Sequence, residues 1–334
     1  MYVQGEVLSS LILRYIEIPD TSMVSEFGRL MLQEIMQSAI ANGDIDFDYA
    51  EDKLRCVSES LEIELSLLAS INRAPSWGLL LAPCERVQFC PSCIREDLKS
   101  IRFPVWRLNW GYAHYTVCDI HLCPLQVLKG EYRCNNPLYR INSVGRYILD
   151  HPSEAVGPSY SGEVGRLLSI MAVVANKIQD QLCAWREQSM TERSNLFFGL
   201  FSAVLRAYMK PVDAPPYCYQ LSKSLLRENV APVANHGSAV GDLFFGHTRA
   251  TSVTARMIGL VMTAVILDVS SARADWQNIV ALFADIGVLV PNNPTWLFTT
   301  CTGTADQGVR GWLTSSNGEK LNLPHFLLED LTLP

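Results

Sequence analysis

Two pairs of residues with the chemistry of metal ligands lie in the first half of the chain. Residues 90–93 read Cys-Pro-Ser-Cys, and after a loop of 24 residues the chain reads Cys-Asp-Ile-His at 118–121. Two residues between ligands let both side chains of a pair turn toward one ion, as in structural zinc sites. The spacing predicts a closed, structural Zn2+ site formed by Cys90, Cys93, Cys118 and His121. Unligated buried thiols are the alternative.

Three further cysteines, Cys84, Cys123 and Cys134, lie close to these pairs. They form no second pair at ligand spacing, so we expect free core thiols, with a second metal as the alternative. Ten cysteines, several at ligand spacing, favour bound metal in a reducing compartment over a disulfide scaffold. We therefore expect the protein in the cytoplasm.

The same stretch interleaves basic and aromatic residues. Such a mixture can neutralise phosphates and stack bases, so the basic members are candidate contacts for nucleic acid or a partner. Alternatively, the aromatic residues form the core around the metal and the basic groups are solvated. The candidates are Arg95, Lys99, Arg102 and Arg107, and the aromatic residues are Phe103, Trp106, Trp110 and Tyr112.

The sequence contains none of the catalytic signatures that we sought. It has neither the phosphate-binding Gly-x4-Gly-Lys-Ser/Thr pattern nor a Gly-x-Ser-x-Gly nucleophile elbow. The run from Asp44 to Asp48 begins like a calcium loop but has Tyr49 where glycine is needed and Arg55 where glutamate is needed. We expect a solvated acidic loop there, or a docking surface for a basic partner. The closed ligand set also argues against a zinc enzyme, so the chain is predicted not to be an enzyme.

Hydrophobic periodicity predicts a mainly α fold. A short step at 62–64 suggests a helix-turn-helix, with a plain bundle corner as the alternative. Short β-like runs at 288–290, 296–300 and 309–313, with Asn317-Gly318 as a hairpin turn, suggest a winged-helix ending. The helices are expected at 6–16, 23–41, 51–61, 65–72, 163–186, 191–209, 252–269 and 275–286.

These elements predict three domains. A helical unit with a helix-turn-helix-like turn spans 1–83, a zinc-ribbon-like module spans 84–140, and a helical C-terminal domain spans 141–334. The longest apolar run, 257–267, is about half of what crosses a bilayer, so we expect no membrane contact. Glu6 and Glu17 interrupt the first apolar stretch, which therefore does not read as a signal peptide.

Several motifs together resemble the TniQ family, over about the first 135 residues. The central ones are Cys-Pro-x-Cys at 90–93, Arg-x-x-Trp at 107–110, Cys-x-x-His at 118–121 and a leucine four residues later. Many members carry another cysteine pair after the first knuckle, where this chain keeps only Cys134. The opening residues agree at the same relative spacings: Glu6, Leu8, Ser10 and Arg14.

The resemblance implies a non-catalytic adaptor that selects targets for DNA transposition and recruits the AAA+ regulator TnsC. In CRISPR-associated transposons such proteins dock on an RNA-guided Cascade or effector complex, in some systems as a homodimer. The net charge of −7 favours this kind over a protein that binds DNA by bulk electrostatics, so nucleic acid is expected mainly through the assembly. The alternative is a sequence-specific DNA-binding protein that recognises an attachment site. We expect the dimer contact near Leu196-Phe197-Phe198 and Leu243-Phe244-Phe245.

Overall fold

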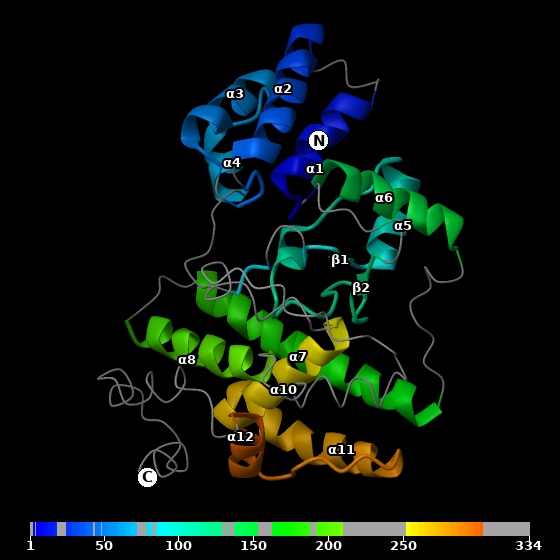
Figure 1. Cartoon of the computed structure of the whole chain (residues 1–334), viewed down its shortest axis with the longest axis vertical. Coiled ribbons are helices and arrows are strands. Elements are labelled where there is room, and N and C mark those ends of the chain that lie inside the picture. The colour runs from blue at the N-terminus through cyan, green and yellow to red at the C-terminus, as the bar shows by residue number, and fades with distance from the viewer. Residues whose placement is uncertain are drawn as a thin grey trace. The chain divides into compact units, whose positions relative to one another are not determined.

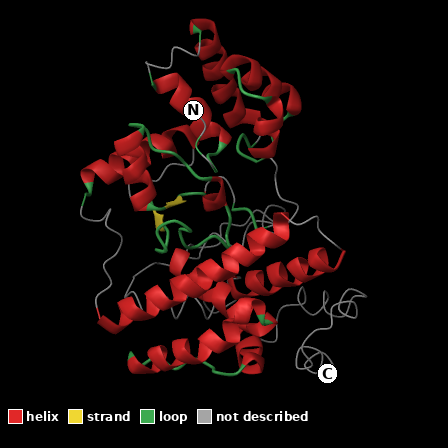
Figure 2. Ribbon diagram, turned by 180° about the vertical axis from the view of Figure 1, so that it is seen from behind, coloured by secondary structure: helices red, strands yellow, loops and turns green. Residues whose placement is uncertain are grey.

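The fold is taken from a computed structural model of the chain (Figure 1). The chain divides into two compact units. Unit 1 comprises Met1–Ser76, Leu80–Tyr112 and Leu125–Gly157, and unit 2 comprises Trp77–Leu79, Ala113–Pro124 and Pro158–Pro334. Figure 2 shows that helices dominate the described part of both. The structure describes residues 3, 5–18, 25–42, 44–47, 49–71, 79–81, 85–128, 132, 137–152, 162–187, 192–209 and 252–302.

Unit 1 begins with four helices around one apolar core. They are α1 (Leu8–Glu17), α2 (Glu26–Asn42), α3 (Glu51–Leu61) and α4 (Leu65–Ile71). Leucine and isoleucine side chains from all four helices fill the core, because each helix turns its apolar residues to one side. The link from α3 to α4 is short: Glu62 adopts φ 53°, and the Ile63 amide donates to the Ser58 carbonyl.

The remainder of unit 1 surrounds a two-stranded antiparallel ribbon. Strand β1 (Gln88–Phe89) pairs with β2 (Gln126–Val127) in the register Gln88 to Val127. Helix α5 (Pro91–Ser100) follows β1 directly and packs against α6 (Pro137–Asp150). A short 3-10 turn, η2 (Leu108–Gly111), lies beside β1. The ribbon places the knuckle that contains Cys90 and Cys93 at the start of α5.

Unit 2 is built around a helix with no exposed side. Every residue of α10 (Val253–Leu267) is buried, and this helix packs against four others. Ser252 begins α10 by accepting a hydrogen bond from the Ala255 amide, a standard N-cap. The turn η5 (Val269–Ser271) joins α10 to the next helix. The four neighbours are α7 (Gly162–Glu187), α8 (Glu192–Met209), α11 (Ala272–Asp285) and α12 (Pro294–Thr302).

The mainly α prediction is confirmed, and all eight expected helices form close to their predicted bounds. Periodicity missed α5 and α6. The winged-helix prediction is wrong at 296–300, which belongs to α12, and 288–290 forms no strand. The remaining wing residues, 309–313 and 317–318, lie outside the described part. Among the described residues, no single helix is long and apolar enough to cross a membrane. Helices Val253–Leu267 and Val269–Asp285 reach the length and apolar composition of a membrane span only when taken together, and the pair is bent by 119°.

The expected dimer contact around Phe198 is not available at that side chain. Phe198 is buried, and its neighbour Phe197 makes an edge-to-face contact with Trp185 at 5.1 Å between ring centroids. The second expected contact segment, 243–245, lies outside the described residues. Local runs of aromatic residues in α8 therefore serve the core of unit 2.

Candidate metal centre

The first ligand pair is positioned by the start of α5. Cys90 is the N-cap residue of this helix, and Pro91 occupies its first turn, where a missing N–H costs nothing. The helical turn then brings Cys93 to the same side as Cys90, because residues three apart lie on one face of a helix. Both thiols are buried.

The second pair lies on a tight turn before β2. The Leu122 amide donates to the Cys118 carbonyl, and the Cys118 amide donates to the Cys123 carbonyl, each at 2.9 Å. Leu122 adopts φ 48°, an unfavourable conformation for a branched side chain that this turn imposes. The result places His121 beside Cys118.

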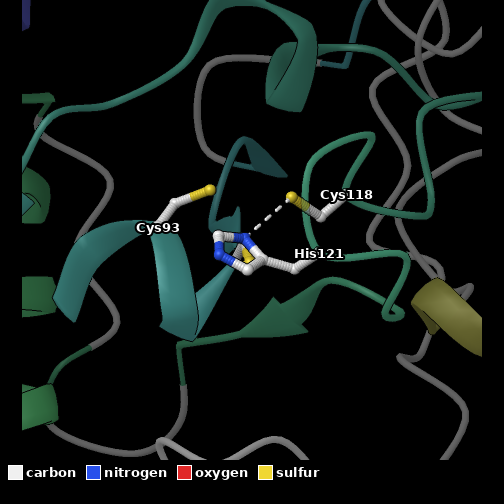
Figure 3. Close-up of side chains that lie close together, drawn as sticks. Cys93, Cys118 and His121 are labelled. Atoms are coloured by element: carbon white, nitrogen blue, oxygen red, sulfur yellow. Dashed lines mark hydrogen bonds between the residues drawn. The ribbon is translucent and has the colours of Figure 1, made fainter. Parts of the chain in front are cut away.

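The four predicted ligands do come together. One ligand atom from each of Cys90, Cys93, Cys118 and His121 lies within 4.8 Å of all the others. The Cys118 Sγ to His121 Nδ1 distance is 3.6 Å. Figure 3 shows the labelled Cys93 and Cys118 sulfurs turned toward the His121 ring. The cluster can therefore hold a metal ion.

The donor set and the distance from Cys118 Sγ to His121 Nδ1 suit tetrahedral zinc. With Zn–S near 2.3 Å and Zn–N near 2.0 Å, tetrahedral angles require a sulfur-to-nitrogen separation of about 3.5 Å. Three thiolates and an imidazole are also soft ligands of the kind that zinc prefers over calcium or magnesium. All three cysteines are buried, and His121 is half-buried. Four protein ligands would fill a tetrahedral shell and leave no open coordination position for a reacting water.

A glutamine of unit 2 holds the segment that leads to Cys118. Gln179 in α7 is buried, and its Oε1 accepts hydrogen bonds from the amides of Thr116, at 2.8 Å, and Val117, at 3.0 Å. Its Nε2 donates to the Val117 carbonyl at 2.9 Å. One side chain thus satisfies three backbone groups immediately before the ligand. Sequence periodicity gave no sign of this role, because Gln179 only reads as a polar position in a helix.

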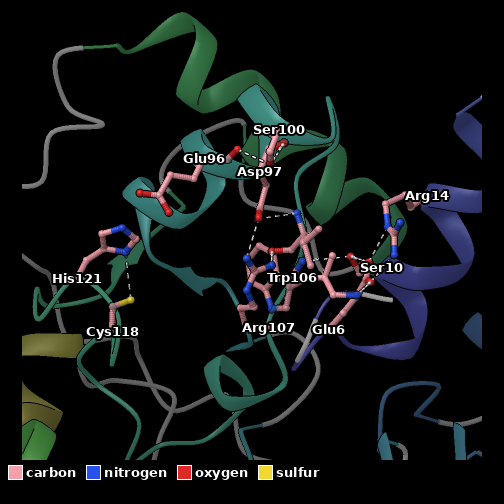
Figure 4. Close-up of polar contacts among 12 residues, drawn as sticks. Glu6, Ser10, Arg14, Glu96, Asp97, Ser100, Trp106, Arg107, Cys118 and His121 are labelled. Atoms are coloured by element: carbon pink, nitrogen blue, oxygen red, sulfur yellow. Dashed lines mark hydrogen bonds and ion pairs between the residues drawn. The ribbon is translucent and has the colours of Figure 1, made fainter. Parts of the chain in front are cut away.

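The N-terminal motif residues form one buried polar network (Figure 4). The Arg14 guanidinium donates to both carboxylate oxygens of Glu6, at 3.2 and 2.7 Å, and Ser10 Oγ donates to Glu6 at 3.1 Å. Ser10 Oγ in turn accepts the Trp106 amide at 3.1 Å. Glu6 is 0% and Arg14 5% exposed. The spacing Glu6, Ser10, Arg14 follows the helical period because the network lies on one side of α1.

A second network joins α5 to the Arg-x-x-Trp segment. Arg107 donates to Asp97 Oδ1 at 2.7 Å, and Asp97 Oδ2 accepts the Val105 amide at 3.2 Å. The Arg107 guanidinium lies 5.8 Å from the centre of the Trp110 ring. Burial raises the pKa of Asp97, although Arg107 opposes the shift. The pKa of Arg107 is itself raised, because its bond to Asp97 outweighs burial. Arg107 therefore braces the fold.

The four basic candidates differ in their surroundings. Arg107 is ion-paired, with its side chain 16% exposed, so it is poorly placed to reach nucleic acid. Arg95 is half-buried, whereas Lys99 and Arg102 are exposed near the end of α5. Trp106 and Trp110 are buried and meet edge to face at 5.5 Å. These aromatic residues thus belong to the core, which was the alternative interpretation of the sequence pattern.

The expectation of a solvated acidic loop at 44–48 is wrong for Asp46, and Asp48 lies outside the described residues. Asp46 is 1% exposed and accepts the Ser9 amide at 2.9 Å, with Arg140 at 3.7 Å. Asp44 forms a two-bond ion pair with Arg86. Burial raises the pKa of Asp46, and Arg140 lowers it. Because their partners lie about 40 and 95 residues further along the chain, no local pattern could have identified these pairs.

Residues 2–125 match the TniQ family model. This part of the chain is a TniQ domain. The matched span contains the metal cluster and both buried networks, so the motif residues of the TniQ domain in this chain hold its fold together. No curated protein and no solved structure matches the chain.

A TniQ domain indicates a transposition-related targeting protein, and the family is generally non-catalytic. The candidate metal centre agrees with a structural role of this kind. The TniQ domain here gathers the cysteines and histidine of its ligand pairs and its paired ions into buried or half-buried contacts. Cys123 is half-buried and is in no disulfide, while Cys84 and Cys134 lie outside the described residues.

Proposed function

We propose that this chain is a non-catalytic adaptor for target selection in DNA transposition. In this role it links an RNA-guided, Cascade-like complex to a TnsC-type AAA+ regulator. The TniQ match over 2–125 carries the proposal, together with the motif residues buried in two networks beside the ligand cluster. An adaptor needs a rigid framework for docking surfaces, and these contacts supply one.

The metal in this proposal is a structural zinc ion held by Cys90, Cys93, Cys118 and His121. When bound, zinc supplies a cross-link between the knuckle at α5 and the turn before β2. Gln179 orients the segment leading to Cys118, and Asp97 with Arg107 orients the segment after α5. The described cysteines form no disulfide with one another, which suits a reducing cytoplasm.

Contacts with nucleic acid are proposed to be local and to occur within the assembly. Lys99 and Arg102 are exposed near the end of α5, with Arg95 half-buried on the same helix, whereas the whole chain carries a net charge of −7. A homodimer belongs to the same proposal. The alternative function is direct recognition of a DNA attachment site.

Two observations separate the adaptor from the attachment-site reader. Genes for an RNA-guided complex and a TnsC-like ATPase beside this gene would support the adaptor. The biochemical counterpart is the affinity of the purified, zinc-loaded chain for duplex DNA at physiological salt. The adaptor hypothesis predicts only weak binding to duplex DNA, with a Kd of about 1 μM or higher, as non-specific phosphate contacts give. Nanomolar binding to one particular duplex without any guide complex would favour the attachment-site reader.

A further inference from the structure

In the part of the chain that the structure describes, the corner between α3 and α4 presents an exposed helix face. Helix α4 turns Leu68 into the core, at 0% exposure, and leaves the opposite side open. We call that open side the α4 face; it consists of Ser66, Leu67, Ala69 and Ser70, all exposed. Leu67 is 37% exposed and is the only large apolar side chain of the face. The small neighbours would allow another chain to approach the α4 backbone closely.

The border of this face is acidic. Glu59, Glu62 and Glu64 are exposed, and residues 59–71 contain no lysine or arginine. The nearest cation along the chain is Arg73, which lies outside the described residues. Lys53 and Arg55 lie at the other end of α3, where Arg55 is 3.5 Å from Glu51. Ser66 Oγ donates to Glu64, so this carboxylate is held beside the α4 face. Within residues 59–71 the three carboxylates therefore have no cation of their own segment beside them.

This composition argues against insertion of α4 into DNA. The second helix of a DNA-reading helix-turn-helix presents base edges with donors such as arginine, asparagine or glutamine. Helix α4 offers only serine hydroxyls. Three carboxylates on its border would also face the phosphates, whose charge dominates DNA affinity.

We propose that the α4 face is a docking surface for a basic segment of a partner protein. Lysine or arginine side chains of that segment meet Glu59, Glu62 and Glu64, and one apolar side chain packs on Leu67. Charge complementarity selects this occupant, because an acidic border with an apolar centre fits a basic amphipathic segment and repels nucleic acid. The inference goes beyond the adaptor role and rests on this surface alone.

A defined peptide tests the proposal with the full-length, zinc-loaded chain. The probe is a labelled 16-residue amphipathic peptide of lysine and leucine, titrated by fluorescence anisotropy in about 0.1 M salt. The triple variant Glu59→Gln, Glu62→Gln, Glu64→Gln keeps the side-chain shapes and removes three charges. Its matched control, Glu34→Gln, Glu96→Gln, Glu163→Gln, removes three exposed charges from α2, α5 and α7.

We expect the first variant to bind the peptide about tenfold more weakly, from three exposed ion pairs, and the control to bind almost as the parent does. Leu67→Ser should also weaken binding, and its loss should persist at high salt. Hydrogen exchange should show peptide-dependent protection within 59–71. Equal weakening in both triple variants would overturn the proposal, because it would mean attraction by net charge alone. Protection of the same amides by a 30-base-pair duplex, in place of the peptide, would assign the face to nucleic acid and also overturn it.

Discussion

The buried pair Glu6–Arg14 offers a sharp test of the motif network. Glu6→Gln keeps the shape but removes the charge that faces a guanidinium whose side chain is 6% exposed. The glutamine oxygen can still accept one hydrogen bond, while its NH2 group must face another donor from Arg14 or Ser10. Removing one partner of a buried pair costs about 3–5 kcal/mol, because the other charge stays buried without compensation. We expect about 3 kcal/mol, since one hydrogen bond survives.

A double variant separates the worth of the pair from the cost of an orphaned charge. Glu6→Met with Arg14→Met removes both charges and leaves an apolar pair of similar length. Its loss of unfolding free energy should be smaller than the sum of the single losses by about 2 kcal/mol or more. The surface pair Arg55–Glu51, with side chains 62% and 77% exposed, supplies the control. Arg55→Gln should cost less than about 0.5 kcal/mol.

Hydrogen exchange of the α1 amides is the suitable assay, because fluorescence would mix tryptophans from both units. The free energies of opening follow residue by residue under conditions where the chain stays native. If Glu6→Gln costs no more than Arg55→Gln, the network is not the brace that its geometry indicates. Additive losses in the double variant would refute the reasoning in the same way.

Three further predictions concern the metal cluster and its supports. Cys93→Ser or Cys118→Ser should unfold the metal-binding segment, because zinc binding contributes roughly 10–16 kcal/mol to such folds. Elemental analysis should then find well under one zinc ion per chain. The control Cys56→Ser should keep its zinc. Gln179→Met should cost about 3 kcal/mol in unit 2 by leaving three buried backbone groups unsatisfied, and should speed zinc loss to a chelator, while the exposed Lys177→Met should do neither. Arg107→Ala should lower thermal stability, because it leaves the buried Asp97 without its ion-pair partner. Arg102→Ala should leave thermal stability unchanged. It should reduce the log-log salt slope of binding to an RNA-guided complex by about 1, the value for one lost phosphate contact. Unchanged salt dependence in Arg102→Ala would remove that residue from the interface.

The helices and the ligand set could be predicted because their signals are local. Helices α2, α3 and α7 repeat apolar residues at the helical period, and the ligand pairs are recognisable because two residues separate the ligands of each pair. Helix α5 escaped notice because its short run alternates ligands, charges and buried positions with no clean apolar stripe. Residues 296–300 were read as a strand from their aromatic and threonine content, yet Pro294 begins a helix there, at a position where proline is favourable.

The buried polar contacts could not be read from the sequence, because their partners are distant along the chain. Asp46 meets Arg140, and Gln179 meets Thr116 and Val117, only after the helices have packed. Local pattern therefore assigned the Asp44–Asp48 run to solvent, where charged residues usually lie. The motif residues Glu6 and Arg107 were visible as a resemblance, but their structural role emerges only from the distances.

The adaptor proposal is tested most directly by a bridging experiment. An RNA-guided complex encoded near this gene is immobilised and incubated with the neighbouring TnsC-type ATPase, with or without the zinc-loaded chain. The account predicts that the ATPase is retained only when the chain is present, and that Cys118→Ser abolishes retention. Retention of the ATPase without the chain, or failure of the intact, zinc-loaded chain to bind either partner, would contradict it.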